Sequence, residues 1–365
     1  MPSIEVLQPV PAPIINPMKQ AALTGATVDL DELALAARNS FLAELQEVGD
    51  YRALWHNEMR AFDGKPNSAC VPHKWEYAIA RDIVLRSACA TTPAEAERRA
   101  LLMLNPGVRR APYTSDTILG AWQLLLPGER ALCHRHTVFA LRFFIEGAGA
   151  YTAVGGDKMY MEPGDLVLTT QFAWHDHGNE GTTPAIWLDG LDQPLFEGNF
   201  PINFQTRLMQ HPDGEGKRYH DSTVKSGAEA PRQYKWADMK ERLDAAPGSS
   251  IRLEYLNPSM VDQHVSRTIA AYALRVDANS RAKTRHDTCN NIFHCVAGDG
   301  VVYITDREGN TSEMPFRKND TWVIPAWHAF TVCGGNEKAY LFTYTDFATL
   351  EKLGFYATGE THEEY

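Results

Sequence analysis

Two stretches of sequence decide the fold, His134-Arg135-His136 and Trp174-His175-Asp176-His177, with His175 lying 39 residues after His136. Side chains alternate between the two faces of a β-strand, so this spacing directs His134 and His136 to one face and Arg135 to the other. His175 can complete the set from a second strand. Neutral imidazoles are common metal ligands, and the pattern therefore predicts a metal site divided between two β-strands.

The sequence around these histidines has a pattern of short strands and turns that is typical of a β-barrel. From Thr117 onward, short runs rich in Val, Ile, Thr, Tyr and Phe alternate with turn signals. The turn signals are Pro127-Gly128, Gly147-Ala148-Gly149, Gly155-Gly156-Asp157 and Pro163-Gly164-Asp165. Many short strands separated by glycine turns indicate an antiparallel barrel or sandwich.

The same order of signals occurs twice in the chain. Residues 146–151 match residues 297–303, and residues 161–169 match residues 316–325, at offsets of about 150 to 155 positions. Two barrels are therefore predicted.

Outside the barrels, the chain is expected to be extended or helical. Five prolines in residues 1–20 exclude a regular helix there and predict an extended arm. Apolar residues at helical spacing predict helices at 29–48 and 75–90, with shorter ones at 237–246 and 346–353. The expected organisation is an arm and helical region at 1–110, a first barrel with the metal site at 111–198, a linker at 199–250 and a second barrel at 251–365.

Composition excludes several functional classes. The 365 residues carry a net charge of −11, whereas nucleic acids and anionic membrane surfaces require a basic footprint. The six cysteines form no CxxC pair, so neither a disulfide framework nor a thiolate zinc site is indicated. There is no apolar run of 18 residues and no secretory leader pattern. A cytoplasmic location, without a membrane partner, is the expectation.

At this point the motifs resemble the cupin superfamily. His134-Arg135-His136, Glu146-Gly147-Ala148-Gly149, Pro163-Gly164-Asp165 and His175 are similar to the two motifs that carry a metal inside a jelly-roll barrel. A longer ordered set resembles gentisate 1,2-dioxygenase and its salicylate and 1-hydroxy-2-naphthoate relatives over about residues 50–350. That set is Glu97-Arg98-Arg99-Ala100-Leu101, Leu104-Asn105-Pro106-Gly107, Leu126-Pro127-Gly128, Leu141-Arg142-Phe143 and Asp189-Gly190-Leu191. The resemblance implies a mainly β bicupin, with two jelly-roll barrels and an N-terminal helical region, which assembles as a homo-oligomer, either a dimer or a tetramer.

The residues themselves favour an anionic ligand. No carboxylate follows His136 within five residues, so three histidines would leave the full charge of a divalent metal for the substrate to neutralise. Arg142 stands an even six residues beyond His136 and, on an uninterrupted strand, would enter the same interior. Burying an unpaired guanidinium costs several kcal/mol, which an incoming carboxylate would offset. The alternative is that Arg142 pairs with Glu146 or Asp189.

The family resemblance implies a role for each remaining candidate. It implies Fe(II) held by His134, His136 and His175, with a small aromatic hydroxycarboxylate and O2 as substrates. Arg98 and Arg142 would handle the substrate carboxylate, and His177 would lie beside bound substrate and oxygen. Asp189 would hold a histidine ring, or could simply close a turn. The pocket candidates, on the strand before His134, are Leu119, Ala121 and Gln123.

The small Ala121 and the aliphatic Leu119 resemble the gentisate-specific members of the family. The resemblance therefore implies gentisate, opened to maleylpyruvate, as the substrate, with salicylate and 1-hydroxy-2-naphthoate as alternatives. Two further alternatives stay open at this point, which are a non-catalytic bicupin binding protein and a metal-dependent cupin isomerase. In the second barrel, His286, His294 and His328 invite a second metal site. Arg285 and Asp287 flank His286 where a His-x-His pair would be needed, so a degenerate, structural second barrel is expected.

Overall fold

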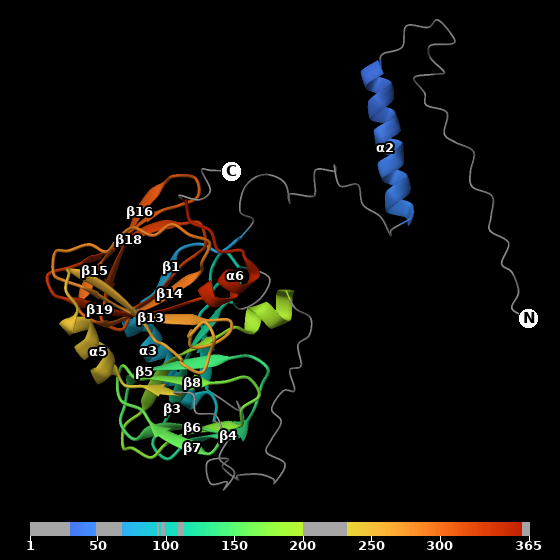
Figure 1. Cartoon of the computed structure of the whole chain (residues 1–365). Coiled ribbons are helices and arrows are strands. Elements are labelled where there is room, and N and C mark those ends of the chain that lie inside the picture. Colours follow the sequence, from blue (N-terminus) through green and yellow to red (C-terminus); the bar gives the residue numbers. More distant parts are fainter. Residues whose placement is uncertain are drawn as a thin grey trace, which may run out of the picture. The chain divides into compact units, whose positions relative to one another are not determined.

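The computed structural model describes residues 30–48, 68–92, 95, 99–108, 113–199 and 232–359 (Figure 1). These residues fall into two units, 1–67 and 68–365, each described by itself. The described part of the first unit is the helix α2 (Leu30–Val48), which confirms the helix predicted at 29–48. The predicted arm at 1–20 and the candidate Arg98 lie outside the described residues.

The first barrel of the second unit is built from two antiparallel sheets. Their strand orders are β11-β8-β5-β10-β3-β2 and β4-β9-β6-β7. The strands are β2 (Ala100–Leu102), β3 (Leu119–Leu125), β4 (Arg130–His134), β5 (Ala140–Glu146), β6 (Ala150–Val154), β7 (Asp157–Tyr160), β8 (Leu166–Thr169), β9 (His175–Asn179), β10 (Ala185–Leu191) and β11 (Gln233–Tyr234).

The second barrel repeats this plan with the orders β1-β17-β14-β19-β13-β12 and β16-β15-β18. Its strands are β1 (His73–Trp75), β12 (Ser250–Glu254), β13 (Ala270–Val276), β14 (Asn291–Ala297), β15 (Asp299–Thr305), β16 (Thr311–Arg317), β17 (Thr321–Ile324), β18 (Ala329–Gly334) and β19 (Ala339–Thr345). Both six-stranded sheets recruit short strands from outside the ranges 111–198 and 251–365, namely β1, β2 and β11.

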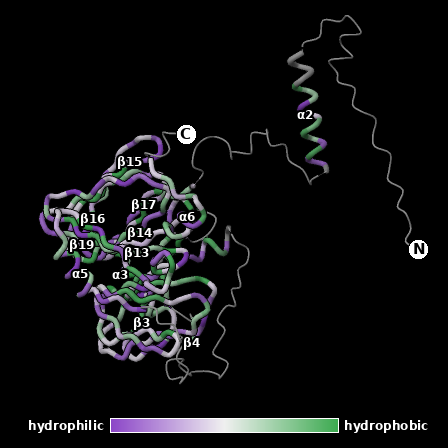
Figure 2. Tube along the Cα trace, viewed as in Figure 1, coloured by the Kyte–Doolittle hydropathy of each residue, from purple (hydrophilic) through white to green (hydrophobic). Residues whose placement is uncertain are grey.

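The two six-stranded sheets pack against each other and form the central core. Hydrophobic stretches lie around the labels of β13 and β14 in Figure 2. Successive residues of β3, β5, β10, β13 and β19 are buried, so each sheet has one face toward its own barrel and one toward the other sheet. Phe143 of β5 stacks on Phe342 of β19 with ring centroids 4.2 Å apart, and both belong to one buried cluster with Tyr344 and Leu188. The opposite face of the first sheet, including Phe144 and Trp187, fills the interior of the first barrel.

Two buried aspartates tie the barrels together symmetrically. Asp192, just after β10, accepts hydrogen bonds from the Phe139 N–H (2.8 Å) and from Thr268 of the second barrel (2.6 Å). Asp346, just after β19, accepts them from the Asn290 N–H (2.9 Å) and from Thr117 of the first barrel (2.6 Å). Corresponding positions are 151 or 154 residues apart, within the range of offsets in the sequence repeat.

The predicted helices of this unit are present. They are α3 (Tyr77–Arg86) followed by the 3-10 turn η2 (Ser87–Cys89), α5 (Trp236–Ala245) and α6 (Phe347–Leu353). The first differs at its start, because Trp75 lies in β1, paired with Thr321. All six cysteines are free thiols, as predicted. Among the described residues, no helix combines the length and apolar character needed to cross a membrane.

Candidate metal centre

Three histidine rings converge inside the first barrel. His134 ends β4, His175 begins β9, and the two are paired across the strands. Ring centroids lie 4.1 Å apart for His134 and His175, 4.8 Å for His136 and His175, and 5.6 Å for His134 and His136. The expectation that His134 and His136 alternate along one strand was wrong for His136. The register shifts between Ala131 and His134 and the strand ends there, so His136 reaches the site from the following turn.

The nitrogen donors of these rings suit a divalent metal. One ligand nitrogen from each ring lies within 4.8 Å of the others. The Nδ1 atoms of His136 and His175 lie 2.8 Å from the carbonyl oxygens of Val138 and Ala173. A carbonyl only accepts, so each Nδ1 carries the proton and each Nε2 presents a lone pair. The Nε2 of His175 is buried and makes no hydrogen bond with the protein, as expected of a metal ligand.

Electrostatics favour the neutral form of His175. Burial, then the neighbouring charges of His134 and His136, hold the pKa of His175 well below its ordinary value. A neutral imidazole is the form that binds metal. His175 is therefore ready to coordinate at neutral pH without first losing a proton.

Beside the triad, the barrel interior holds a buried ion pair. Arg142 of β5 lies with its Nε 3.3 Å from Asp189 of β10, and donates a hydrogen bond to Thr169. Trp187 Nε1 donates to the same Asp189 carboxylate at 3.1 Å. Arg142 is buried as predicted. The prediction that one uninterrupted strand joins His136 to Arg142 was wrong, since β4 and β5 are separate strands.

Pairing with Asp189 was one of the two alternatives for Arg142. The other candidate partner, Glu146, instead binds Arg81 at 2.8 Å. The buried charge of Arg142 is therefore paired with the carboxylate of Asp189, as expected for a charge in a barrel interior. Arg142 still lies close enough for its charge to lower the pKa of His175.

The three pocket candidates lie on one face of strand β3 in the same sheet. In the β3–β10 register, Leu119 faces Leu191, Ala121 faces Asp189, and Gln123 faces Trp187. Directly paired residues share a face of the sheet, so all three candidates are on the interior face. Asp189 is also paired with Arg142. The row Ala121–Asp189–Arg142 thus crosses three strands, with its smallest side chain next to the ion pair.

His177 lies on the same face of β9 as His175, two residues away. Its ring centroid is 5.6 Å from that of His175, 6.2 Å from His134 and 5.7 Å from Trp187. Its Nδ1 is 2.9 Å from the hydroxyl of Thr152 on β6. This contact fixes the orientation of a fourth buried imidazole at the edge of the triad.

The sequence reading missed three interior side chains, Thr152, Thr169 and Trp187. Trp187 could have been found from the alternation Trp187-x-Asp189-x-Leu191, because the predicted Asp189 defines the face. The Thr152 and Thr169 contacts depend on pairing between strands that are distant in sequence. Next to the undescribed Arg98, Arg99 is buried and forms a two-point pair with Glu129, at 2.5 and 3.0 Å.

The second barrel does not repeat the triad. His328 is held as His175 is, with Nδ1 3.1 Å from the Ala326 carbonyl. His294, however, faces the central core, 5.4 Å from the Phe143 ring and bonded to Thr321, and burial lowers its pKa to about 3. In the part of the chain that the structure describes, metal-ligating side chains gather in threes only at His134, His136 and His175.

Comparison with known proteins agrees with this geometry. The cupin domain family model matches residues 121–190, which contain the triad. Gentisate 1,2-dioxygenase 1 of Aquipseudomonas alcaligenes is 31% identical over 87% of this chain and 95% of that protein. A 1-hydroxy-2-naphthoate 1,2-dioxygenase of Nocardioides sp. (strain KP7) is 31% identical over 91% of this chain and 89% of that protein.

A solved structure extends the similarity to three dimensions. Salicylate 1,2-dioxygenase from Pseudoaminobacter salicylatoxidans, crystallised with gentisate, superimposes with a TM-score of 0.74 and 27% identity, covering 92% of this chain and 95% of that one. The chain therefore belongs to the gentisate and salicylate 1,2-dioxygenase family of ring-cleaving bicupin enzymes.

Proposed function

We propose that this enzyme is an Fe(II)-dependent gentisate 1,2-dioxygenase, which opens the ring between the carboxylate- and hydroxyl-bearing carbons to give maleylpyruvate. The observation that carries the proposal is the cluster of three histidines, His134, His136 and His175, next to the Arg142 guanidinium in one barrel interior. Membership of a ring-cleaving family replaces the binding-protein and isomerase alternatives.

In this proposal, His134, His136 and His175 hold the iron. When bound, Fe(II) would supply the redox chemistry that joins O2 to the activated ring. Three neutral ligands leave the metal its full charge, which favours a substrate that brings a carboxylate and an ionised hydroxyl. Acidic protein ligands would reduce that preference, and none joins the triad among the described residues.

Arg142 would orient the substrate carboxylate. Thr169 and Asp189 hold its guanidinium at the contacts given above, and the planar fork of N–H donors matches the geometry of a carboxylate. Asp189 keeps the guanidinium fixed, and Trp187 in turn holds Asp189. The buried pair is thus a positioned donor rather than a mobile surface charge, which lowers the ordering cost of binding.

His177 would hold a proton near the reacting atoms. Thr152 contacts its Nδ1, and Nε2 would form a hydrogen bond with substrate or oxygen. An imidazole is suited to proton transfer near neutral pH. Arg98 remains a proposed partner of the substrate carboxylate on family grounds alone.

Ala121 supports gentisate over bulkier or differently substituted rings. It pairs with Asp189 in the row that contains Arg142, so its methyl group leaves room where a larger residue would press on the substrate ring. Known relatives include enzymes named for gentisate, 1-hydroxy-2-naphthoate and 5-aminosalicylate. Salicylate and 1-hydroxy-2-naphthoate are therefore the alternative substrates.

O2 uptake by protein reconstituted anaerobically with Fe(II) tests the proposal. We expect gentisate to consume one O2 per ring and give the ultraviolet absorbance of maleylpyruvate, and salicylate and 1-hydroxy-2-naphthoate to react far more slowly. Faster uptake with either alternative would reassign the substrate. Bound iron with no uptake from any of the three would show that the site serves another ring.

We also propose a homo-oligomer, a dimer or tetramer, working in the cytoplasm. Free thiols at all six cysteines and a family of catabolic dioxygenases support that setting. Light scattering coupled to size exclusion would measure the assembly. A monomer at micromolar concentration would contradict it.

A further inference from the structure

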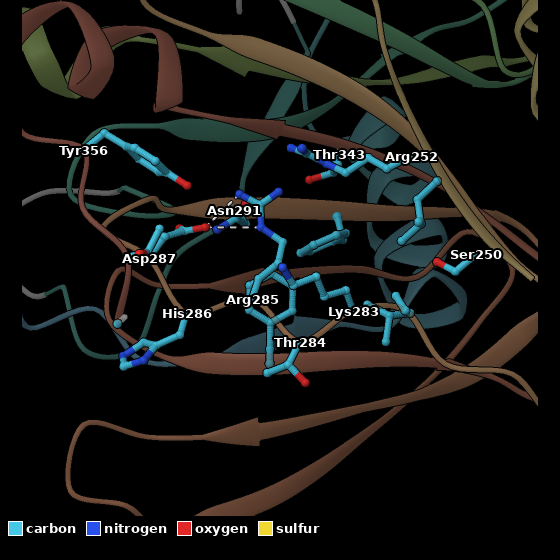
Figure 3. Close-up of a pocket in the computed structure, with 17 residues that line it drawn as sticks. Ser250, Arg252, Lys283, Thr284, Arg285, His286, Asp287, Asn291, Thr343 and Tyr356 are labelled. Atoms are coloured by element: carbon cyan, nitrogen blue, oxygen red, sulfur yellow. Dashed lines mark hydrogen bonds and ion pairs between the residues drawn. The ribbon is translucent and has the colours of Figure 1, made fainter. Parts of the chain in front are cut away.

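A cavity opens in the second barrel, and the described residues that line it belong to that barrel and to the C-terminal segment (Figure 3). Its volume is about 730 Å³, within the range of small-molecule sites, roughly 300–1,000 Å³. None of the triad residues contributes to it. The proposed dioxygenase chemistry therefore does not account for this cavity.

Cationic side chains dominate the charge of the lining. Arg252, Lys283 and Arg285 line the cavity, and among the described lining residues Asp287 is the one carboxylate. This leaves an excess of positive charge in a chain whose net charge is −11. Such a local concentration in an acidic protein indicates attraction of an anion.

Arg252 extends into the barrel without a carboxylate partner. It is paired in register with Leu274, which belongs to the buried interior of this barrel. Its guanidinium lies over the Tyr272 ring, 3.3 Å from the centroid, and within the described residues no carboxylate forms an ion pair with it. The nearby Glu254 is bonded to His264 at 2.5 Å. An arginine held this way can still bind an oxyanion through its N–H edge.

Arg285 is fixed in place by a local pair. It contacts Asp287 at 2.7 and 3.2 Å, while Asp287 also accepts the Cys289 N–H at 3.0 Å. Burial, then the charge of Arg285, lower the pKa of Arg252 to about 10. Both guanidiniums are thus protonated at neutral pH and repel each other, and an anion between them would relieve that repulsion.

A polar and an apolar wall complete the cavity. The hydroxyl of Thr343 is buried there and makes no hydrogen bond, although a buried hydroxyl normally has a partner. Tyr356 and Arg252 also project into the space (Figure 3). The apolar lining is Leu274, Phe293, Phe330 and Val332.

We propose that this cavity is a second ligand site, at which Arg252 and Arg285 bind the carboxylate of a small organic acid without a metal. The carboxylate would lie between the guanidiniums, with the Thr343 hydroxyl donating to it, and the apolar body of the acid would rest on Phe293 and Phe330. The second barrel would thus still bind a ligand in its interior, but through arginines rather than through histidines and a metal. This inference does not depend on which ring the first barrel cleaves.

Equilibrium dialysis of the iron-loaded enzyme under argon, with radiolabelled benzoate, tests the site. Benzoate has one carboxylate on an apolar ring and no hydroxyl beside it to chelate a metal. We expect Arg252→Met to remove one benzoate per chain from the measured stoichiometry, or weaken that site by about 10- to 100-fold, the usual worth of a charged hydrogen bond. Arg252→Lys keeps the charge but loses the two-point geometry. Its affinity for benzoate should lie between that of the wild type and that of Arg252→Met.

Controls separate this site from general charge effects and from misfolding. Arg281, exposed on the same segment but outside the cavity, provides the matched variant Arg281→Met, which should bind as the wild type does. Arg285→Met combined with Asp287→Asn gives a second loss-of-site variant that leaves no buried unpaired charge. Equal benzoate stoichiometry in wild type and both loss-of-site variants would overturn the proposal. So would equal loss in Arg281→Met, or displacement by inorganic phosphate at the concentrations at which benzoate binds.

Discussion

At the residue scale, the histidines of the triad are positioned by main-chain atoms. The carbonyls of Val138 and Ala173 fix the tautomers of His136 and His175. Loss of such an outer partner typically costs about 10–100-fold in metal affinity. A carbonyl cannot be removed by substitution, so the rings themselves are the place to test the site.

His175→Ala is expected to abolish iron retention and O2 uptake while preserving the fold, because it removes a buried ligand without leaving a buried charge. Iron content and thermal unfolding would be measured together. The matched control is His328→Ala, which removes the histidine held in the same way in the second barrel and should leave both iron and turnover unchanged. Full iron occupancy in His175→Ala would refute the ligand assignment, and loss of turnover in His328→Ala would show that the second barrel takes part in catalysis.

Arg142→Met is expected to weaken binding of the hydroxybenzoate much more than binding of iron. It also leaves the buried Asp189 carboxylate without its cation, which typically costs about 3–5 kcal/mol of stability. The double variant Arg142→Met/Asp189→Asn should recover much of that stability without recovering substrate affinity. Substrate Kd under argon, iron content and the free energy of unfolding distinguish these effects. Equal loss of iron and substrate affinity would make Arg142 structural.

At the element scale, the strands position the site through their faces. β10 carries Trp187 and Asp189 on the barrel side and Leu188 on the side of the central core. Gly190, on that core side, lies against the second barrel. A Cβ there would come within 2.5 Å of Tyr344 Cε2 and 3.0 Å of Leu141 Cδ1.

Gly190→Ala is therefore expected to destabilise the protein by about 1–3 kcal/mol, the usual penalty for overpacking a core. Tyr344 is fully buried and has no room to turn away. Combining Gly190→Ala with Tyr344→Leu should lose less stability than the sum of the two single changes, because the clash is shared. Thermal unfolding measures all three variants, and an additive result would mean that the added methyl group does not press on Tyr344.

At the scale of the whole molecule, Asp192 and Asp346 connect the barrels through equivalent hydrogen bonds. Burial raises the pKa of Asp192 to about 7 and that of Asp346 to about 6. Each folded-state pKa lies above the ordinary carboxyl value of 3.8. Between about pH 4 and about pH 7 the folded protein thus holds protons that the unfolded chain has released, so these groups make stability fall as pH rises through that window.

Asp192→Asn should reduce this loss of stability with rising pH. The amide oxygen still accepts the Phe139 N–H, and the Thr268 hydroxyl can turn to accept from the amide nitrogen. We expect the variant to gain stability relative to wild type at about pH 8 and to lose that advantage near pH 4. Thermal unfolding across the range measures it. A wild-type advantage that grows with pH would mean that ionised Asp192 stabilises the contact between the barrels.

The sequence by itself determined the duplicated β-barrel, the principal helices and the three histidines of the candidate metal centre. These follow from local rules, since strand alternation, helical spacing and glycine turns depend on neighbours in the chain. His175 and His177 share a face for that reason, and so do Leu119, Ala121 and Gln123.

Only the tertiary structure decided the contacts between distant strands. It brought His136 to the triad from a turn, gave Arg142 its partners Asp189 and Thr169, and turned His294 toward the central core. It also gathered Arg252 from β12 and Arg285 from a later segment around one cavity. Register and bulges set these contacts, and both depend on how whole sheets pack, so no local pattern encodes them.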